Sequence, residues 1–238
     1  MARRGELKKS LVKEKDKRPI RWRKYPHLFL IVCEDGNTEP HYFKAFAKLF
    51  PEETVFLRAV GTGRSSKGVV EQAIIERDKL ATEANKNVDE VWSVFDKDDA
   101  EKIPANTARF NEAFKIAQEE KIKIGYSNEV FELWLLLHFT DVSSEKPIPR
   151  IEIYSRLEAE IKSTPAHKDF VYEHGKTEVI DVLLKIGNES KAIIRAEKLY
   201  GEQKEKQPID ANPNTSVFIL IKRLRELVEW YSYIPGRN

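Results

Sequence analysis

The chain has 238 residues, 41% of them hydrophobic and 34% charged, and its formal net charge at pH 7 is +2. This length and composition predict one sizeable hydrophobic core with a small appendage rather than several independent domains. The sequence has no run of about 18 uncharged apolar residues, no apolar secretory signal and only one cysteine, Cys33, so we expect a cytoplasmic protein without a membrane partner or an intrachain disulfide.

The first 24 residues are strongly basic. They contain eleven Lys or Arg side chains and three acidic ones, a formal charge of +8, so residues 25–238 carry −6. A basic arm of this kind attracts the phosphates of a nucleic acid. A disordered tail that only keeps the protein in solution has the same composition, and both interpretations stay open.

Residues 27–126 alternate between predicted strands and predicted helices. Short apolar runs that end in polar residues predict strands at 27–33, 54–60, 91–95 and 121–126. After the first three strands we expect a helix capped by Asn37 or Thr38, a helix at 69–80, and a helix through Phe110 and Ala117. This alternation predicts βαβ units, and therefore an α/β fold with a mostly parallel sheet flanked by helices.

Strand patterns fade after residue 140. An apolar helix is expected at 130–139, followed by a linker at 143–149, helices near 151–161, 177–186 and 192–200, and a last helix at 217–230 that a turn at 212–216 could cap. We therefore expect three parts: a basic arm over residues 1–24, an α/β core over 25–140, and a helical region packed on that core over 141–238.

Acidic side chains directly follow two of the predicted strands. Glu34 comes after the first strand, and Asp96 and Asp98 form a D-x-D pair, followed by Asp99, after the strand at 91–95. Ligands of open parallel sheets bind outside the carboxyl ends of the strands, and carboxylate oxygens suit Mg²⁺ or, alternatively, Mn²⁺. We expect these aspartates to bind the ion and Glu34 to be a further ligand or the general base. Any one of the acids could instead cap a helix.

A glycine-rich loop, GTGRSSKG at residues 61–68, precedes the predicted helix at 69–80. Arg64, Ser65 and Lys67 would lie near free backbone N–H groups at the start of that helix, which favours an anion such as phosphate. The loop is not a Walker A motif, in which a Lys and then a Ser or Thr follow the last glycine. Here Lys67 precedes the last glycine, Gly68, and Val69 follows it. An ordinary glycine-rich turn is the alternative.

The segment SNEVFELWLLLHF at residues 127–139 places ionisable groups on an apolar helix. Charges rarely enter a core unpaired, so Glu132 is expected either to line the site as a fourth acid or to pair with a basic side chain. His138 could bind metal or phosphate, although a lone histidine on an apolar helix is more often a core residue.

Four motifs together resemble the RloB family: IVCEDGNTEPHYF at 31–43, VWSVFDKDD at 91–99, SNEVFELWLLLHF at 127–139 and NPNTS at 212–216. The resemblance implies a Toprim-like core, the α/β fold of primases, topoisomerases and OLD-type nucleases. In that fold a Glu after the first strand and a D-x-D after a later strand bind Mg²⁺, and Glu34, Asp96 and Asp98 match these positions. The family's Glu-Gly pair is interrupted here, because Asp35 stands between Glu34 and Gly36.

The resemblance further implies a role in bacterial anti-phage defence and an ABC- or AAA-type ATPase partner encoded nearby. The leading hypothesis is therefore a metal-dependent nuclease that hydrolyses DNA or RNA, tRNA included. The alternative is a non-cleaving nucleic-acid or nucleotide sensor that signals to the ATPase. A phosphatase-type nucleophile at Asp96 is less favoured, because that chemistry usually follows the first strand of the fold. A homo-oligomer is a further option.

Overall fold

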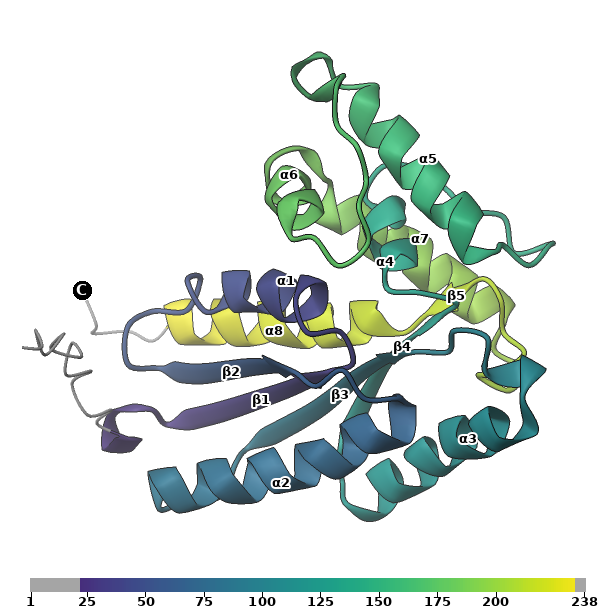
Figure 1. Ribbon diagram of the computed structural model, residues 1–238. Helices are drawn as coiled ribbons and strands as arrows, with labels where there is room; N and C mark the ends of the chain where they lie inside the picture. The colour runs from purple at the N-terminus through teal and green to yellow at the C-terminus, as the bar shows by residue number, and fades with distance from the viewer. Residues whose placement is uncertain (1–21, 234–238) are drawn as a thin grey trace, which may run out of the picture.

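The computed structural model describes residues 22–233, which form one five-stranded sheet with helices on both faces and a further group of helices at one end (Figure 1). The strand order is β2-β1-β3-β4-β5. The strands are β1 (His27–Cys33), β2 (Val55–Gly61), β3 (Glu90–Asp96), β4 (Lys123–Asn128) and β5 (Asn214–Thr215). The first four strands run parallel and β5 is antiparallel to β4. The predicted α/β class is confirmed.

The predicted basic arm, residues 1–24, lies outside the described residues except for its last three, Trp22–Lys24, which form a short 3-10 helix (η1). None of the helices over residues 22–233 is long and apolar enough to cross a membrane.

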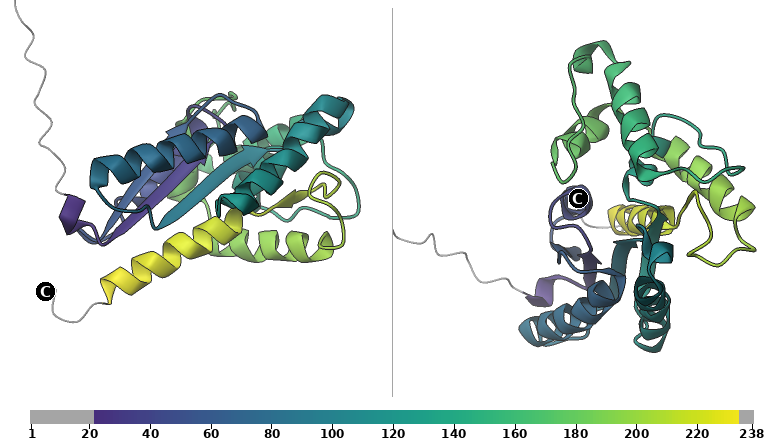
Figure 2. Two further views of the ribbon diagram at one scale, coloured as in Figure 1. Left: turned by 90° about the horizontal axis from the view of Figure 1, so that it is seen from below. Right: turned by 45° about the vertical axis from the view of Figure 1, so that its right-hand side comes forward.

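Helices cover both faces of the sheet (Figures 1 and 2). The helices α1 (Thr38–Phe46) and α8 (Val217–Ser232) pack on one face, and α2 (Ser66–Ala84) and α3 (Pro104–Glu119) pack on the other. Successive side chains of β1 alternate between the two layers, so Phe29 and Ile31 join the core with α1 and α8, whereas Leu28 and Leu30 join the core with α2 and α3. A strand buried on both faces reads as a continuous apolar run, which is why β1 could be predicted.

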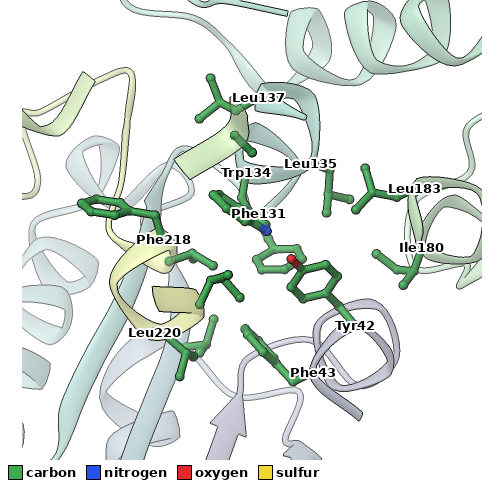
Figure 3. Close-up of a cluster of buried hydrophobic side chains, with 14 of the residues drawn as sticks. Tyr42, Phe43, Phe131, Trp134, Leu135, Leu137, Ile180, Leu183, Phe218 and Leu220 are labelled. Carbon is green, nitrogen blue, oxygen red and sulfur yellow. The ribbon is translucent and has the colours of Figure 1, made fainter. Parts of the chain in front are cut away.

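The second group of helices is built around α4 (Glu132–Leu137), every residue of which is buried. In Figure 3, Trp134 and Leu135 lie between Tyr42 of α1, Leu183 of α6 (Glu178–Ile186) and Phe218 of α8. The other members are α5 (Arg150–Lys162), α6 (Glu178–Ile186) and α7 (Glu189–Glu202), with a short 3-10 helix at Pro165–His167 (η3). Another 3-10 helix, Ala100–Lys102 (η2), lies between β3 and α3 and contacts α3. The chain then returns to the sheet through β5 and α8.

Two predicted helix caps do not form. Asn37 makes no side-chain cap bond to α1; instead, the Asp35 carboxylate accepts a hydrogen bond from the Thr38 N–H at 2.6 Å. Ser216 stands at the N-cap of α8, but its hydroxyl accepts from the Tyr126 N–H at 2.9 Å, in the ladder that also creates β5. Strand β5 has two residues, too few to show a sequence pattern, and was predicted as part of a turn.

The first glycine of the loop at residues 61–68 is required by a close approach of two turns. A Cβ atom on Gly61 would lie 2.2 Å from the Asp35 carbonyl oxygen and 2.6 Å from the Gly36 Cα. Where these two turns meet, the Gly63 N–H also donates a hydrogen bond to the Glu34 carbonyl oxygen at 2.8 Å. The end of β2 therefore holds in place the turn that carries Glu34.

We expect Gly61→Ala to lower the free energy of unfolding by about 1–3 kcal/mol, because its methyl group would overlap backbone atoms that cannot rotate away. The measurement is the midpoint of urea unfolding. Gly201→Ala in α7 is the matched control, because a Cβ there meets nothing within 4 Å, and its midpoint should stay or rise slightly. Equal midpoints for Gly61→Ala and the wild type would show that this approach is not tight.

Candidate functional site

A cleft of about 400 Å³ opens at the carboxyl ends of β1 and β3. It brings together four of the acids expected to act there with two residues of the glycine-rich loop. Its lining residues are Glu34, Ser65, Ser66, Asp96, Lys97, Asp98, Asp99, Ala100, Lys102, Ile103, Asn106, Arg109 and Arg150. Acidic groups and cations thus share one cavity, which lies where an open parallel sheet binds its ligands.

Backbone N–H groups hold the two innermost acids of the cleft. The Glu34 carboxylate accepts a hydrogen bond from the Asp96 N–H at 3.1 Å, which ties the end of β1 to the end of β3. The Asp96 carboxylate accepts from the Phe131 N–H at 3.0 Å, just before α4. The second Asp96 oxygen, Oδ1, is buried without a hydrogen-bond partner. A buried carboxylate oxygen in this state is an acceptor ready for a ligand.

The D-x-D turn is held by the end of β4. The Lys97 N–H donates to the Ser127 carbonyl at 2.9 Å, and the Asp98 N–H donates to the Glu129 carbonyl at 3.0 Å. Asp98 has a φ of 52°, in the left-handed region that aspartate tolerates better than most residues. These bonds place the Asp98 side chain in the cleft beside Asp96.

Two further buried acids lie behind the cleft lining. Glu39 in α1 is 1% exposed; one of its oxygens accepts from the Asp35 N–H at 3.1 Å and the other, Oε1, has no hydrogen-bond partner. Glu132 in α4 is 4% exposed, accepts a hydrogen bond from the Tyr172 hydroxyl, and lies 3.8 Å from His174 Nδ1. Glu132 was expected either to line the site or to pair structurally; the structure gives it these two partners and a place behind the cleft.

Burial and mutual repulsion raise the pKa of these carboxyl groups. Burial raises the pKa of Glu34 to about 8, and the charges of Asp98 and Asp35 add to the effect. The pKa of Asp96 is raised by burial first and then by the charges of Glu39 and Glu132. Burial also raises the pKa values of Glu39 and Asp98. The cluster therefore favours bound protons, or a bound cation, over full ionisation.

Cations balance the outer side of the D-x-D turn. Arg150, the first residue of α5, places Nη1 3.0 Å from Asp98 Oδ1 and Nη2 3.1 Å from Asp99 Oδ2. Asp99 also pairs with Lys102 at 2.7 Å, and its pKa is lowered, first by that hydrogen bond and then by Arg150. Asp99 was predicted as a metal ligand, and these contacts favour a role as an ion-pair partner instead.

The oxygen donors of the cleft fit Mg²⁺ in kind. Mg²⁺ keeps several waters and takes one or two protein carboxylates, and Glu34, Asp96 and Asp98 all line this one cleft. Within residues 22–233, no three His, Cys, Asp or Glu side chains are arranged so that they could all hold one ion directly. The arrangement thus suits a hydrated ion bound by fewer direct carboxylates than the three predicted.

The predicted phosphate loop enters the cleft only in part. Ser65 and Ser66, where α2 begins, line the cavity, but Arg64 does not. Lys67 pairs with Glu112 of α3 at 3.0 Å and with Glu71 of α2 at 3.7 Å. The helix start is therefore the part of the loop that can meet an anion in the cleft.

His138 lies in the core rather than in the cleft. It is 6% exposed and packs edge-on against Trp134, with 5.1 Å between ring centroids. Burial, with the nearby charge of Arg195, lowers its pKa to about 3. His138, the residue that follows α4, is not among the residues that line the cleft.

The prediction missed Arg150 and the inward position of Glu39. Glu39 carried no distinct signal, because an acid in the first turn of a helix is favoured by the helix dipole and is therefore common. Arg150 carried none, because its partners lie far away in the sequence and α5 contains ordinary surface cations as well.

Comparison with protein families gives one match: the family model described as RloB-like protein matches residues 29–224. No curated protein matches the chain, and no solved structure matches it.

We expect the ion-free protein to lose stability as the pH rises from 4.5 towards 8. The folded-state pKa of Glu34 is raised from 4.5 to about 8, so the folded state binds more protons than the unfolded chain between these pH values. The stability that this proton binding gives the folded state is lost as the pH rises. Glu34→Gln should reduce this loss by on the order of 1 kcal/mol, and Mg²⁺ should raise the melting temperature more at pH 8 than at pH 6. Thermal unfolding with EDTA or MgCl₂ measures both effects; an identical pH dependence for the variant and the wild type would contradict the raised pKa.

Proposed function

The chain belongs to the RloB family, and we propose that it is a Mg²⁺-dependent nuclease that hydrolyses phosphodiester bonds in DNA or RNA, with Mn²⁺ as an alternative ion. The observation that carries the proposal is the meeting of Glu34, Asp96 and Asp98 in one cleft whose outer side is lined by cations. A phosphodiester needs both features, because its charge is neutralised by cations while acids position the ion and the attacking water.

The acids of the cleft would divide the chemistry. Asp96 and Asp98 would hold the ion, which when bound polarises the phosphoryl group and lowers the pKa of a coordinated water. Glu34, with a pKa raised to about 8, can take up a proton near neutral pH, which suits a general base. The buried carboxyl groups of Glu39 and Glu132 would act through their charge, which raises the pKa of Asp96.

The cleft also offers groups that could bind the phosphates of the substrate, which favours hydrolysis of a phosphodiester. The start of α2 at Ser65 and Ser66 offers backbone N–H groups to a phosphate, and Arg109 also lines the cavity. We further propose, on the basis of the family resemblance, a cytoplasmic effector of anti-phage defence that works with an ATPase partner. Co-purification with the product of an adjacent ATPase gene would test that partnership.

We expect Asp96→Asn to lower metal-dependent cleavage by at least about 100-fold, because it removes the charge that holds the ion while preserving the size of the side chain. The measurement is cleavage of tRNA, single-stranded RNA and duplex DNA with Mg²⁺ or Mn²⁺. Asp141→Asn is the matched control: it removes the same charge from an acid whose side chain is 73% exposed and pairs with Arg195 at 3.3 Å.

Cleavage by Asp96→Asn at the wild-type rate would refute the assignment of the site. Tight nucleic-acid binding without cleavage, independent of divalent ions and lost on deletion of residues 1–24, would instead identify the sensor.

A further inference from the structure

We infer that Arg150 is the phosphate-binding side chain of this cleft, held by Asp98 and Asp99 until a divalent ion takes Asp98 and releases the guanidinium to the substrate. This inference rests on the proposed function and assigns a role to a residue outside the predicted site. Arg150 comes from α5, in the second group of helices, and lines the cleft of the sheet.

The position of Arg150 in α5 is electrostatically unfavourable for the helix. It is the first residue of a 13-residue helix, where the positive end of the helix dipole disfavours a cation. Its stabilisation comes from outside the helix, through Asp98 at 3.0 Å and Asp99 at 3.1 Å. The helix start therefore presents an arginine to the acids of the β3 turn at some cost to α5 itself.

The backbone at Arg150 is anchored by Glu129, whose carboxylate also lies 4.0 Å from Arg150 Nε. The Arg150 N–H donates to the Glu129 carboxylate at 2.9 Å, which ties the start of α5 to the turn after β4. The guanidinium is free to exchange partners while this anchor holds the helix. The side chain is 29% exposed on the cleft, so a ligand can reach it.

The guanidinium and a divalent ion compete for Asp98. Both are cations, and both would sit against the same carboxylate, so binding of the ion weakens the hold of Asp98 on Arg150. A phosphate that binds the ion brings oxygens into the same cavity, and the planar N–H pair of arginine matches two of them. Metal and nucleic acid should therefore favour each other's binding through Arg150.

The closing experiment measures two affinities of the full chain: that for Mg²⁺ by titration calorimetry, and that for short fluorescent phosphorothioate DNA and RNA oligonucleotides, with Mg²⁺ present, by anisotropy. We expect Arg150→Gln to tighten Mg²⁺ binding by about tenfold, because a competing cation is removed, and to weaken oligonucleotide binding by about tenfold. A merely structural role would weaken both or change neither.

Two variants complete the design. Arg156→Gln removes the same charge from α5, where Arg156 donates to the Asp141 carbonyl at 2.9 Å, and should leave both affinities near the wild-type values. Arg150→Lys keeps the charge without the fork, so it should bind Mg²⁺ like the wild type and the oligonucleotide more weakly; it remains a test if Arg150→Gln does not fold.

The outcomes separate the inference from the proposed function. If the wild type binds Mg²⁺ and cleaves, but Arg150→Gln leaves Mg²⁺ affinity unchanged or weaker, Arg150 is not the competing cation and only the inference falls. If the wild type binds no Mg²⁺, both are overturned. Opposite changes in the two affinities, absent from Arg156→Gln, support the inference.

Discussion

The repulsion among buried carboxyl groups at the ends of β1 and β3 is the constraint on which the site depends. Glu34, Glu39, Asp96 and Glu132 would separate if the chain allowed it, because each ionised group raises the pKa of a neighbour. They stay together because backbone N–H groups of neighbouring turns fix the carboxylates, above all the bonds from Asp96 to Glu34 and from Phe131 to Asp96. The fold thus holds a cluster that favours protons or a cation.

The second group of helices completes this cluster and is therefore more than an appendage. Glu132 accepts a hydrogen bond from the Tyr172 hydroxyl and lies near His174. Tyr172 and His174 both belong to the segment between α5 and α6. His174 has a raised pKa, chiefly through its hydrogen bond to Glu132. The Asn37 amide also donates to the Gly175 carbonyl at 3.3 Å, next to the turn that carries Glu34. Partners from beyond residue 140 thus balance charges that the sheet cannot balance alone.

The strands and the cleft acids could be predicted from the sequence, because both follow from local patterns. The strand β1 has the predicted bounds, and Glu34 and Asp96 stand where apolar strands give way to polar turns. Arg150 and the short strand β5 could not be predicted, because each depends on contacts between segments distant in the sequence. The cap at Asp35 is local, three residues before Thr38, but Asn37 and Thr38 are equally suitable cap residues by type, so the sequence did not single it out. His138 was open to two interpretations from sequence, since the pattern shows that α4 is apolar but not which neighbours enclose it.

The charge of the cleft explains why a polyanion and its catalytic ion would have to arrive together. Residues 25–238 carry a net charge of −6, and the innermost part of the cleft is acidic, so phosphate is repelled there while the acids are ionised. Arg150 and Lys102 do not remove this repulsion, because they are engaged by Asp98 and Asp99. A divalent ion changes both conditions at once: it neutralises the inner acids and competes for Asp98. Under the proposed function, selectivity for a metal-loaded state would then follow from the charge arrangement itself.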